Sequence, residues 1–276
     1  MEADYLKSSV FKKRTVITII GVPAVIAIIW FGMPWLAMLA VIWGMVATYE
    51  FYSIVRRSKE VSPLTYFGMI WAALFILSPL HPNTLPVPAI LTTAVVLPLL
   101  VLLWRKGKQN AFINWGWTVA GILYVGWILS YLVGLRNLVD GRGWVLLSMV
   151  STFGSDICAY LFGRAMGKHK LAPYISPNKT WEGAVAGVVG SVVLALVVAS
   201  IYKLPIGTVE AVFLGIVISI AGQLGDLIKS LFKRNMTVKD SSNLIPGHGG
   251  FLDRMDSQAM AGVAVYYYVF YVVLAR

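Results

Sequence analysis

The chain is organised as a series of long apolar runs separated by short polar connections. Each run is close to the length of one bilayer crossing. No short apolar run is followed by a small-residue cleavage site, so the first apolar run is expected to be a retained helix and not a cleaved signal peptide. The pattern predicts an all-α, polytopic integral membrane protein with about nine transmembrane helices. The expected helices are residues 15–32, 34–55, 64–79, 86–104, 111–134, 143–163, 181–202, 207–234 and 256–275.

Composition supports the same class of protein. Hydrophobic residues make up 58% of the 276 positions and the mean hydropathy is +0.77, which excludes an ordinary soluble domain. The helices leave no room for a separate soluble domain. The single cysteine, Cys158, excludes an intramolecular disulfide and a cysteine-rich metal site, and we expect it to be a small packing residue.

Charge is distributed unevenly between the two sides of the predicted helices. Most of the 23 lysines and arginines fall in alternate connections, including those around Lys12, Arg56, Lys106, Lys168 and Lys233. Basic residues collect on the cytoplasmic side of membrane proteins, so the N-terminus and the long polar loops are expected in the cytoplasm. The net charge of +11 then indicates a basic rim against anionic lipid headgroups, and no nucleic-acid partner is expected.

Asp226 stands out because it lies in the apolar run GIVISIAGQLGDLIKSLFKR. An unpaired carboxylate in such a run is costly, so it should face a protein interior, a water-filled cavity or a cation. Asp226, Lys229, Ser230 and Lys233 recur at helical spacing and share one face. An ordinary ion pair near a helix end is the alternative.

A glycine-rich turn follows this helix. Glycines in PGHGG, residues 246–250, can turn backbone N–H groups toward an anion, and His248 can donate to phosphate, although a surface histidine is an equal alternative. Lys239 and Asp240 precede the turn. Asp253 and Asp256 follow it, three residues apart at the start of the last helix and on either side of Arg254.

The preceding polar connection, GRAMGKHKLAPYISPNKTWEG, is a second candidate for phosphate binding. It is not a Walker A loop, since Lys168 is followed by His169 and not by Ser or Thr. Pro173 and Pro177 stop any helix, and Lys179 lies just before a new helix N-terminus that suits anions. The alternative is a basic loop in which Thr180 is merely a helix N-cap. Asp156 shares a helical face with Arg164 upstream of this connection.

These motifs resemble the phosphatidate cytidylyltransferases, also called CDP-diacylglycerol synthases. The resemblance rests on SLFKR at 230–234, KD at 239–240, PGHGG at 246–250, DRMD at 253–256 and the upstream GKHKLAP and SPNKTWEG segments. It covers about residues 151–260. Lys229 departs from the family pattern, in which an acidic residue is common, and this puts the charge of that helix face in doubt.

The resemblance implies a Mg²⁺-dependent reaction of CTP with phosphatidic acid that gives CDP-diacylglycerol and pyrophosphate. It implies that Asp226 and Asp253 hold the metal with help from Asp256. Phosphates would be held by Lys179, Lys233, Arg234, Lys239, His248, Gly249, Gly250 and Arg254. Lys239, Asp240, His248 and Asp253 are the residues expected to act directly in the reaction.

Three other functions are compatible with parts of the sequence. A CTP-dependent transferase acting on another membrane lipid phosphate or alcohol would use the same motifs. An ion-coupled transporter would use Asp156 and Asp226 as translocation residues, but the acidic residues cluster on one side beside glycine-rich loops, and no paired broken helices are evident. A non-catalytic scaffold would leave PGHGG and DRMD unexplained.

The expected organisation follows from these motifs. Residues 1–135 should form an N-terminal membrane scaffold, and residues 136–276 a catalytic membrane region with two active-site loops. The protein is expected in the bacterial inner membrane with its active site facing the cytoplasm, where it meets CTP while phosphatidic acid stays in the bilayer. A homodimer is left open, because nothing in the helix patterns fixes an interface.

Overall fold

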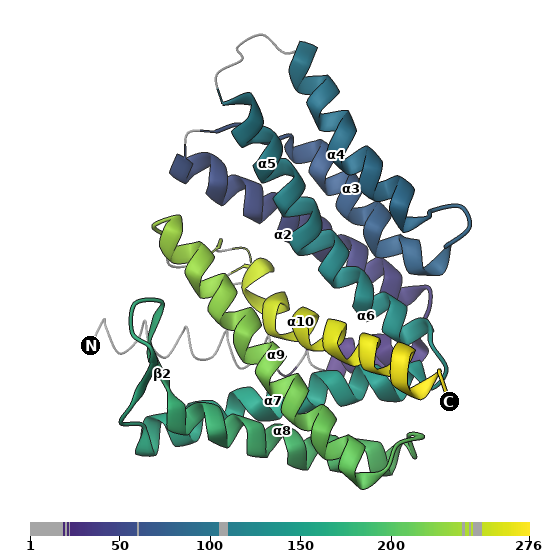
Figure 1. The fold of residues 1–276 in the computed structure, drawn as a ribbon, viewed down its shortest axis with the longest axis vertical. Helices are drawn as coiled ribbons and strands as arrows, with labels where there is room; N and C mark the ends of the chain where they lie inside the picture. The colour runs from purple at the N-terminus through teal and green to yellow at the C-terminus, as the bar shows by residue number, and fades with distance from the viewer. Residues whose placement is uncertain are drawn as a thin grey trace. The chain divides into compact units, whose positions relative to one another are not determined.

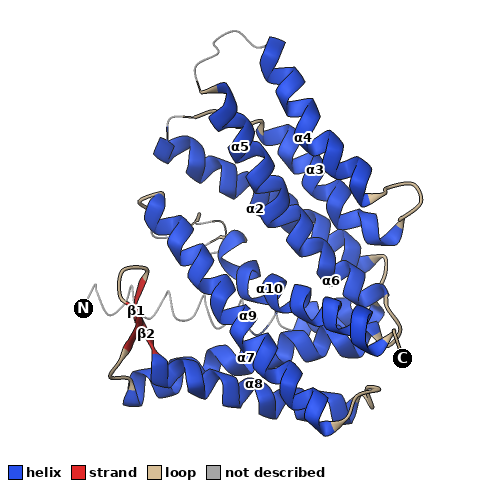
Figure 2. Ribbon diagram, viewed as in Figure 1, coloured by secondary structure: helices blue, strands red, loops and turns tan. Residues whose placement is uncertain are grey.

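The computed structural model describes residues 19, 21, 23–59, 61–104, 110–238, 241, 242, 244 and 250–276 (Figure 1). Helices dominate this part of the chain, and Figure 2 shows one short pair of strands within it. The expected all-α architecture is confirmed. The chain forms two compact units, Met1–Trp127 with Met236–Arg254, and Ile128–Asn235 with Met255–Arg276. The expected functional division near residue 135 stays a prediction.

The first unit is built mainly from the helices of the N-terminal half. Helical residues 23–31 come first. They are followed by α2 (Trp35–Lys59), α3 (Thr65–Leu77) with a 3₁₀ turn η1 (Ser78–Leu80), α4 (Val87–Trp104), α5 (Ala111–Gly121) and the π-helical η2 (Ile122–Trp127). Basic residues close the last turn of α2, where they complement the negative end of the helix dipole.

Buried hydrogen bonds join α2, α3 and α5 inside the first unit. The Tyr52 hydroxyl donates to the carbonyl oxygen of Thr118 at 2.6 Å. The Thr118 hydroxyl in turn accepts from the Leu64 N–H at 2.9 Å, and Asn114 Oδ1 accepts from the Ser62 N–H at 2.7 Å. Because an unsatisfied polar group is costly away from water, these bonds fix how the start of α3 meets α5.

The second unit contains the remaining helices. These are α6 (Ile128–Asn137), α7 (Gly141–Met166), α8 (Trp181–Ile201), α9 (Thr208–Asn235) and most of α10 (Leu252–Tyr268), which continues into the π-helical η3 (Val269–Val273). Helices α7 and α8 run side by side, and α9 packs on both (Figure 1). The Ser155 and Ser219 hydroxyls hydrogen-bond at 2.7 Å, and Gln223 Nε2 donates to the Ala184 carbonyl at 3.1 Å. Polar contacts of this kind join helices where both are surrounded by apolar groups.

The connection between α7 and α8 differs from the irregular loop that its prolines suggest. It forms an antiparallel ribbon of β1 (Lys170–Ala172) and β2 (Ser176–Thr180), in which Lys170 lies opposite Thr180. Proline stops a helix but tolerates extended backbone at a sheet edge, which explains the difference. Thr180 also caps α8, since its hydroxyl accepts from the Gly183 N–H at 3.2 Å, as the alternative interpretation of this connection has it.

Six helices of the described part are long and apolar enough to cross a bilayer, and Thr65–Leu80 is a shorter apolar helix. Large apolar side chains are exposed along their outer faces. On α8 an exposed valine recurs at every fourth position, at Val185, Val189, Val193 and Val197. An exposed apolar stripe of this length suits contact with lipid, so the protein is an integral membrane protein.

Candidate active site

The second unit brings together charged side chains from three of its elements. Lys229 Nζ on α9 lies 3.0 Å from Asp226 Oδ1 and 2.8 Å from Asp256 Oδ2 on α10. Lys179 Nζ, at the end of β2, lies 2.6 Å from Asp226 Oδ2. One lysine therefore bridges two aspartates, and a second lysine reaches the same aspartate from the ribbon. We call Lys179, Asp226, Lys229 and Asp256 the charge cluster.

Helix geometry explains how these side chains meet. Asp226 and Lys229 are three residues apart on α9 and so lie on one face. Gly225 lets α10 come close, because a Cβ atom at this position would lie 2.6 Å from the Asp256 carbonyl oxygen. Thr180 ends β2 and begins α8, which places Lys179 at a helix start. The sequence predicted the shared face but not the closeness of α9 and α10.

Burial makes the charge cluster sensitive to change. The Lys229 side chain is 12% exposed and that of Asp256 is 4% exposed, whereas Lys179 and Asp226 are more accessible. Removing one partner of a buried pair costs roughly 3 to 5 kcal/mol, because a desolvated charge is left uncompensated. Asp156, on α7, lies close enough to the charge cluster to interact electrostatically with its four members.

Two further contacts join the ribbon to neighbouring helices. His169 Nδ1 lies 2.7 Å from Glu182 Oε1 in the first turn of α8. Arg234 Nε donates to the Ile175 carbonyl at 3.3 Å. The predicted phosphate ligand Arg234 thus reaches the ribbon that also carries Lys179, and the second of the two predicted loops is held near the end of α9.

In the first unit, Asp253 organises the chain just before α10. Its Oδ2 atom accepts from the Ser241 N–H at 2.9 Å, the Ser241 hydroxyl at 2.7 Å and the Gly250 N–H at 3.3 Å. Gly250 was predicted to offer its amide to phosphate, and here that amide donates to Asp253. Asp253 and Asp256 lie one turn apart on α10, as expected.

Glu50 is the residue that the sequence reasoning missed. It lies on α2, is 1% exposed and accepts from the backbone N–H groups of Phe251 and Leu252 at 3.1 and 2.8 Å. The signal that singled out Asp226, a carboxylate within an apolar run, also applies to Glu50. The expected role of the N-terminal half as a scaffold gave no reason to place Glu50 at a site.

The remaining predicted residues fall into two groups. Lys233 lies in the last turn of α9, and Arg254 in the first turn of α10. The other four, Lys239, Asp240, His248 and Gly249, lie outside the described residues.

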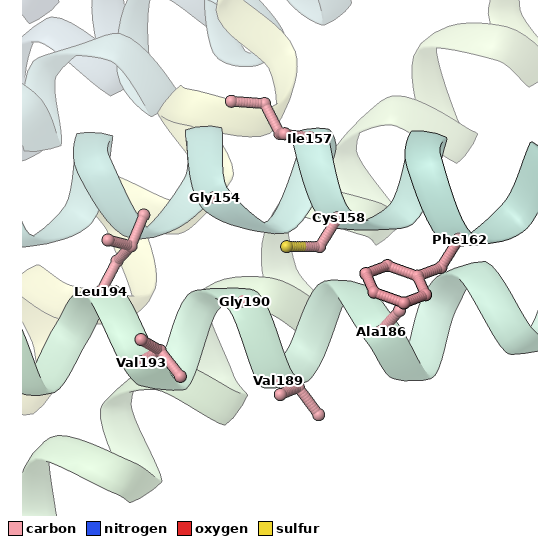
Figure 3. Close-up of a pocket in the computed structure, with 9 residues that line it drawn as sticks. All are labelled: Gly154, Ile157, Cys158, Phe162, Ala186, Val189, Gly190, Val193 and Leu194. Carbon is pink, nitrogen blue, oxygen red and sulfur yellow. The ribbon is translucent and has the colours of Figure 1, made fainter.

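A separate groove lies between α7 and α8 (Figure 3). Its volume is about 500 Å³, and it is lined by Gly154, Ile157, Cys158 and Phe162 on α7 and by Ala186, Val189, Gly190, Val193 and Leu194 on α8. Figure 3 shows the Cys158 thiol between the two helices, close to Gly190. No lining residue carries a charge, so the groove suits apolar packing and not phosphate. Cys158 is a small packing residue, as expected.

Comparison with known proteins points in one direction. The sequence profile of the cytidylyltransferase family matches residues 12–272. The phosphatidate cytidylyltransferase of Bacillus subtilis (strain 168) is 35% identical over 219 residues, which are 78% of this chain and 81% of the relative. That of Staphylococcus haemolyticus (strain JCSC1435) is 32% identical over 248 residues, 89% of this chain and 94% of the relative. That of Brucella suis biovar 1 (strain 1330) is 34% identical over 239 residues, covering 86% and 85%. The resemblance in the motifs is thereby confirmed, and the chain belongs to the cytidylyltransferase family.

Proposed function

We propose that this protein transfers a cytidylyl group from CTP to phosphatidic acid, giving CDP-diacylglycerol and pyrophosphate for phospholipid synthesis. The observation that carries the proposal is the family match over residues 12–272, together with relatives named phosphatidate cytidylyltransferase that align over most of their length. The apolar helices are long enough to place the protein in a membrane, where it would meet a diacyl lipid.

The charge cluster supports this chemistry. The reaction brings two polyanions together, and positioning with neutralisation of phosphate charge is the main requirement. Lys179 and Lys229 supply positive charge, and Asp226 orients both ammonium groups through its two oxygens. The lipid phosphate is already anionic at neutral pH, so it attacks the α-phosphorus of CTP without a strong general base. Lys179 is the more accessible lysine and is the one we assign to a phosphate.

The charge cluster also contains the type of ligand that a divalent cation prefers. Carboxylate oxygens are the ligands that Mg²⁺ prefers, and the carboxylates of Asp226 and Asp256 both pair with the Lys229 ammonium group. Within the described residues no group of three or more His, Cys, Asp or Glu is arranged to hold a metal. Our proposal that Asp226 and Asp256 help to hold Mg²⁺ rests on their carboxylate chemistry. The participation of Asp253 with Asp226, and of Lys239, Asp240 and His248 in the reaction, stays a prediction.

When bound, Mg²⁺ would stabilise charge on the phosphate oxygens. The protein's own contribution is to hold the lysines and carboxylates in a fixed array, since the buried Lys229 spaces Asp226 from Asp256.

Orientation and assembly complete the proposal. The concentration of basic residues in alternate connections supports an active site on the cytoplasmic face of a bacterial inner membrane, where CTP is available. Lipid enters from the bilayer. A homodimer is an expectation that light scattering of the purified protein tests.

The test is product identification with purified, detergent-solubilised protein. CTP, Mg²⁺ and phosphatidic acid together should give CDP-diacylglycerol by mass spectrometry and an equal amount of pyrophosphate, while omission of any one component gives neither. Asp253→Asn, checked for folding by its elution profile, serves as the inactive control. If folded wild-type protein transfers the cytidylyl group only to a prenyl-type lipid phosphate or alcohol, that lipid and not phosphatidic acid is the acceptor. A folded protein that is inactive on every acceptor would contradict the proposal.

A further inference from the structure

Glu50 is placed unusually for an acidic residue in a membrane-spanning helix. It lies in α2, nine residues before the basic end of that helix at Lys59, and its side chain is buried. Its two oxygens accept four hydrogen bonds from residues about two hundred positions away in the sequence. A buried carboxylate is costly unless such bonds satisfy it, and these four bonds supply that compensation.

The four donors come from both ends of one connection. Ser242 Oγ donates to Oε1 at 2.5 Å and Ser241 Oγ to Oε2 at 3.3 Å. On the far side, the N–H of Phe251 donates to Oε1 and that of Leu252 to Oε2. Glu50 therefore ties the chain before residue 243 to the chain after residue 249.

The second anchor is the start of α10. Leu252 is the first residue of this helix, and carboxylates are stabilised by the exposed N–H groups and positive dipole of a helix N-terminus. Glu50 supplies that charge from another helix, α2. Trp43, two turns earlier on α2, adds a third tie, because its indole N–H donates to the Phe251 carbonyl at 3.1 Å.

Asp253 completes the base of the connection. It accepts from Ser241 and Gly250, so Ser241 contacts both carboxylates. A Cβ atom on Gly250 would overlap the Glu50 carboxylate and the Ser241 hydroxyl, so only glycine fits here. Glu50 and Asp253 thus hold the two ends of the connection together by a shared set of serine and backbone donors.

We propose that Glu50 is a positioning residue for cytidylyl transfer, which acts by fixing the base of the α9–α10 connection and the first turn of α10. This inference rests on the proposed function. Glu50 does not touch substrate. It sets the orientation of Asp253 through Ser241 and Gly250, and it sets where α10, the helix of Asp256, begins.

The test compares Glu50→Gln with Tyr49→Phe, a neighbouring α2 residue that is 48% exposed and contributes no bond to this network. Glutamine keeps the size of the side chain, but its NH₂ group cannot accept from two of the four donors. We expect Glu50→Gln to lower kcat roughly ten- to hundredfold with KM for CTP changed less than threefold, because misplacing a group held by the connection costs rate. Tyr49→Phe should behave as wild type.

Hydrogen exchange supplies the readout that does not depend on activity. Amides of Gly250, Phe251 and Leu252 should exchange faster in Glu50→Gln, whereas those of α3 and α5 should not change. Should Glu50→Gln fail to fold, Ser242→Ala removes one donor from the loop side and should show the same faster exchange with a smaller loss of kcat.

Two results would overturn the inference. One is wild-type exchange at Gly250 to Leu252 in a folded Glu50→Gln protein. The other is faster exchange there with an unchanged kcat, which would make the tether purely structural. An inactive wild-type protein would instead refute the proposed function, and the exchange comparison would still decide whether Glu50 holds the connection.

Discussion

The two units satisfy their carboxylates in different ways. In the first unit, Glu50 and Asp253 accept hydrogen bonds from serine hydroxyls and backbone N–H groups. In the second, Asp226 and Asp256 pair with the side chains of Lys179 and Lys229. Fixed backbone dipoles suit a carboxylate that holds the chain in place. Flexible ammonium groups suit a site where charge must be shared with incoming phosphates and a cation.

The largest effect separating the two kinds of site is expected for Lys229→Met. This change removes the bridge between Asp226 and Asp256 and leaves the nearly buried Asp256 carboxylate without its ammonium partner. We expect a loss of roughly 3 to 5 kcal/mol in stability and at least a hundredfold in rate. Thermal unfolding in detergent, with and without Mg²⁺, measures this.

Mg²⁺ should raise the Tm of Lys229→Met more than that of wild type, because a divalent cation replaces the missing charge. The matched control is Lys203→Met, a lysine between α8 and α9 for which the structure gives no ion pair within the described residues. Equal Mg²⁺ effects on wild type and Lys229→Met would mean that the carboxylates do not attract the metal.

A smaller effect is expected for Lys179→Ala. Lys179 pairs with Asp226 from an accessible ribbon, so its loss should leave stability nearly unchanged. A charge-assisted bond to phosphate is worth about 1.5 to 3 kcal/mol, or about ten- to a hundredfold. We expect that factor in kcat/KM for CTP, measured by steady-state kinetics, with partial recovery in Lys179→Arg. Unchanged kinetics would remove Lys179 from phosphate binding.

The smallest effect is expected for His169→Ala. The His169 side chain is 79% exposed, and an exposed ion pair such as that with Glu182 contributes little to stability. Activity should therefore stay within about threefold of wild type. A large loss of activity would show that His169, just before β1, takes part in the reaction although it lies outside the charge cluster.

Much of the fold could be predicted because bilayer crossings leave a strong signal in sequence. The runs that became α4, α8 and α9 were placed to within two residues at each end, since lipid demands long apolar helices with few charges. The β ribbon could not be predicted, because two prolines exclude a helix without selecting a particular extended pairing. The π-helical stretch after α5 also left no signal in the apolar run.

The site was predictable only in part. Asp226 and Lys179 were singled out by local chemistry, and the structure brings them together. The ion pair between Lys229 and Asp256 joins two helices. Residue spacing within one helix does not predict which residues of another helix it will contact. Glu50 shows the same limit more strongly, because its four donors lie some two hundred residues away.

The central claim is that the charge cluster serves cytidylyl transfer, and single-turnover formation of CDP-diacylglycerol by Asp226→Asn tests it most directly. The control is Glu210→Gln, at the other end of α9, where Glu210 pairs with Arg276. With both proteins reconstituted at equal amounts in the same vesicles, Asp226→Asn should form no detectable product while Glu210→Gln keeps a rate near that of wild type. Substantial product from a folded Asp226→Asn protein would contradict the account.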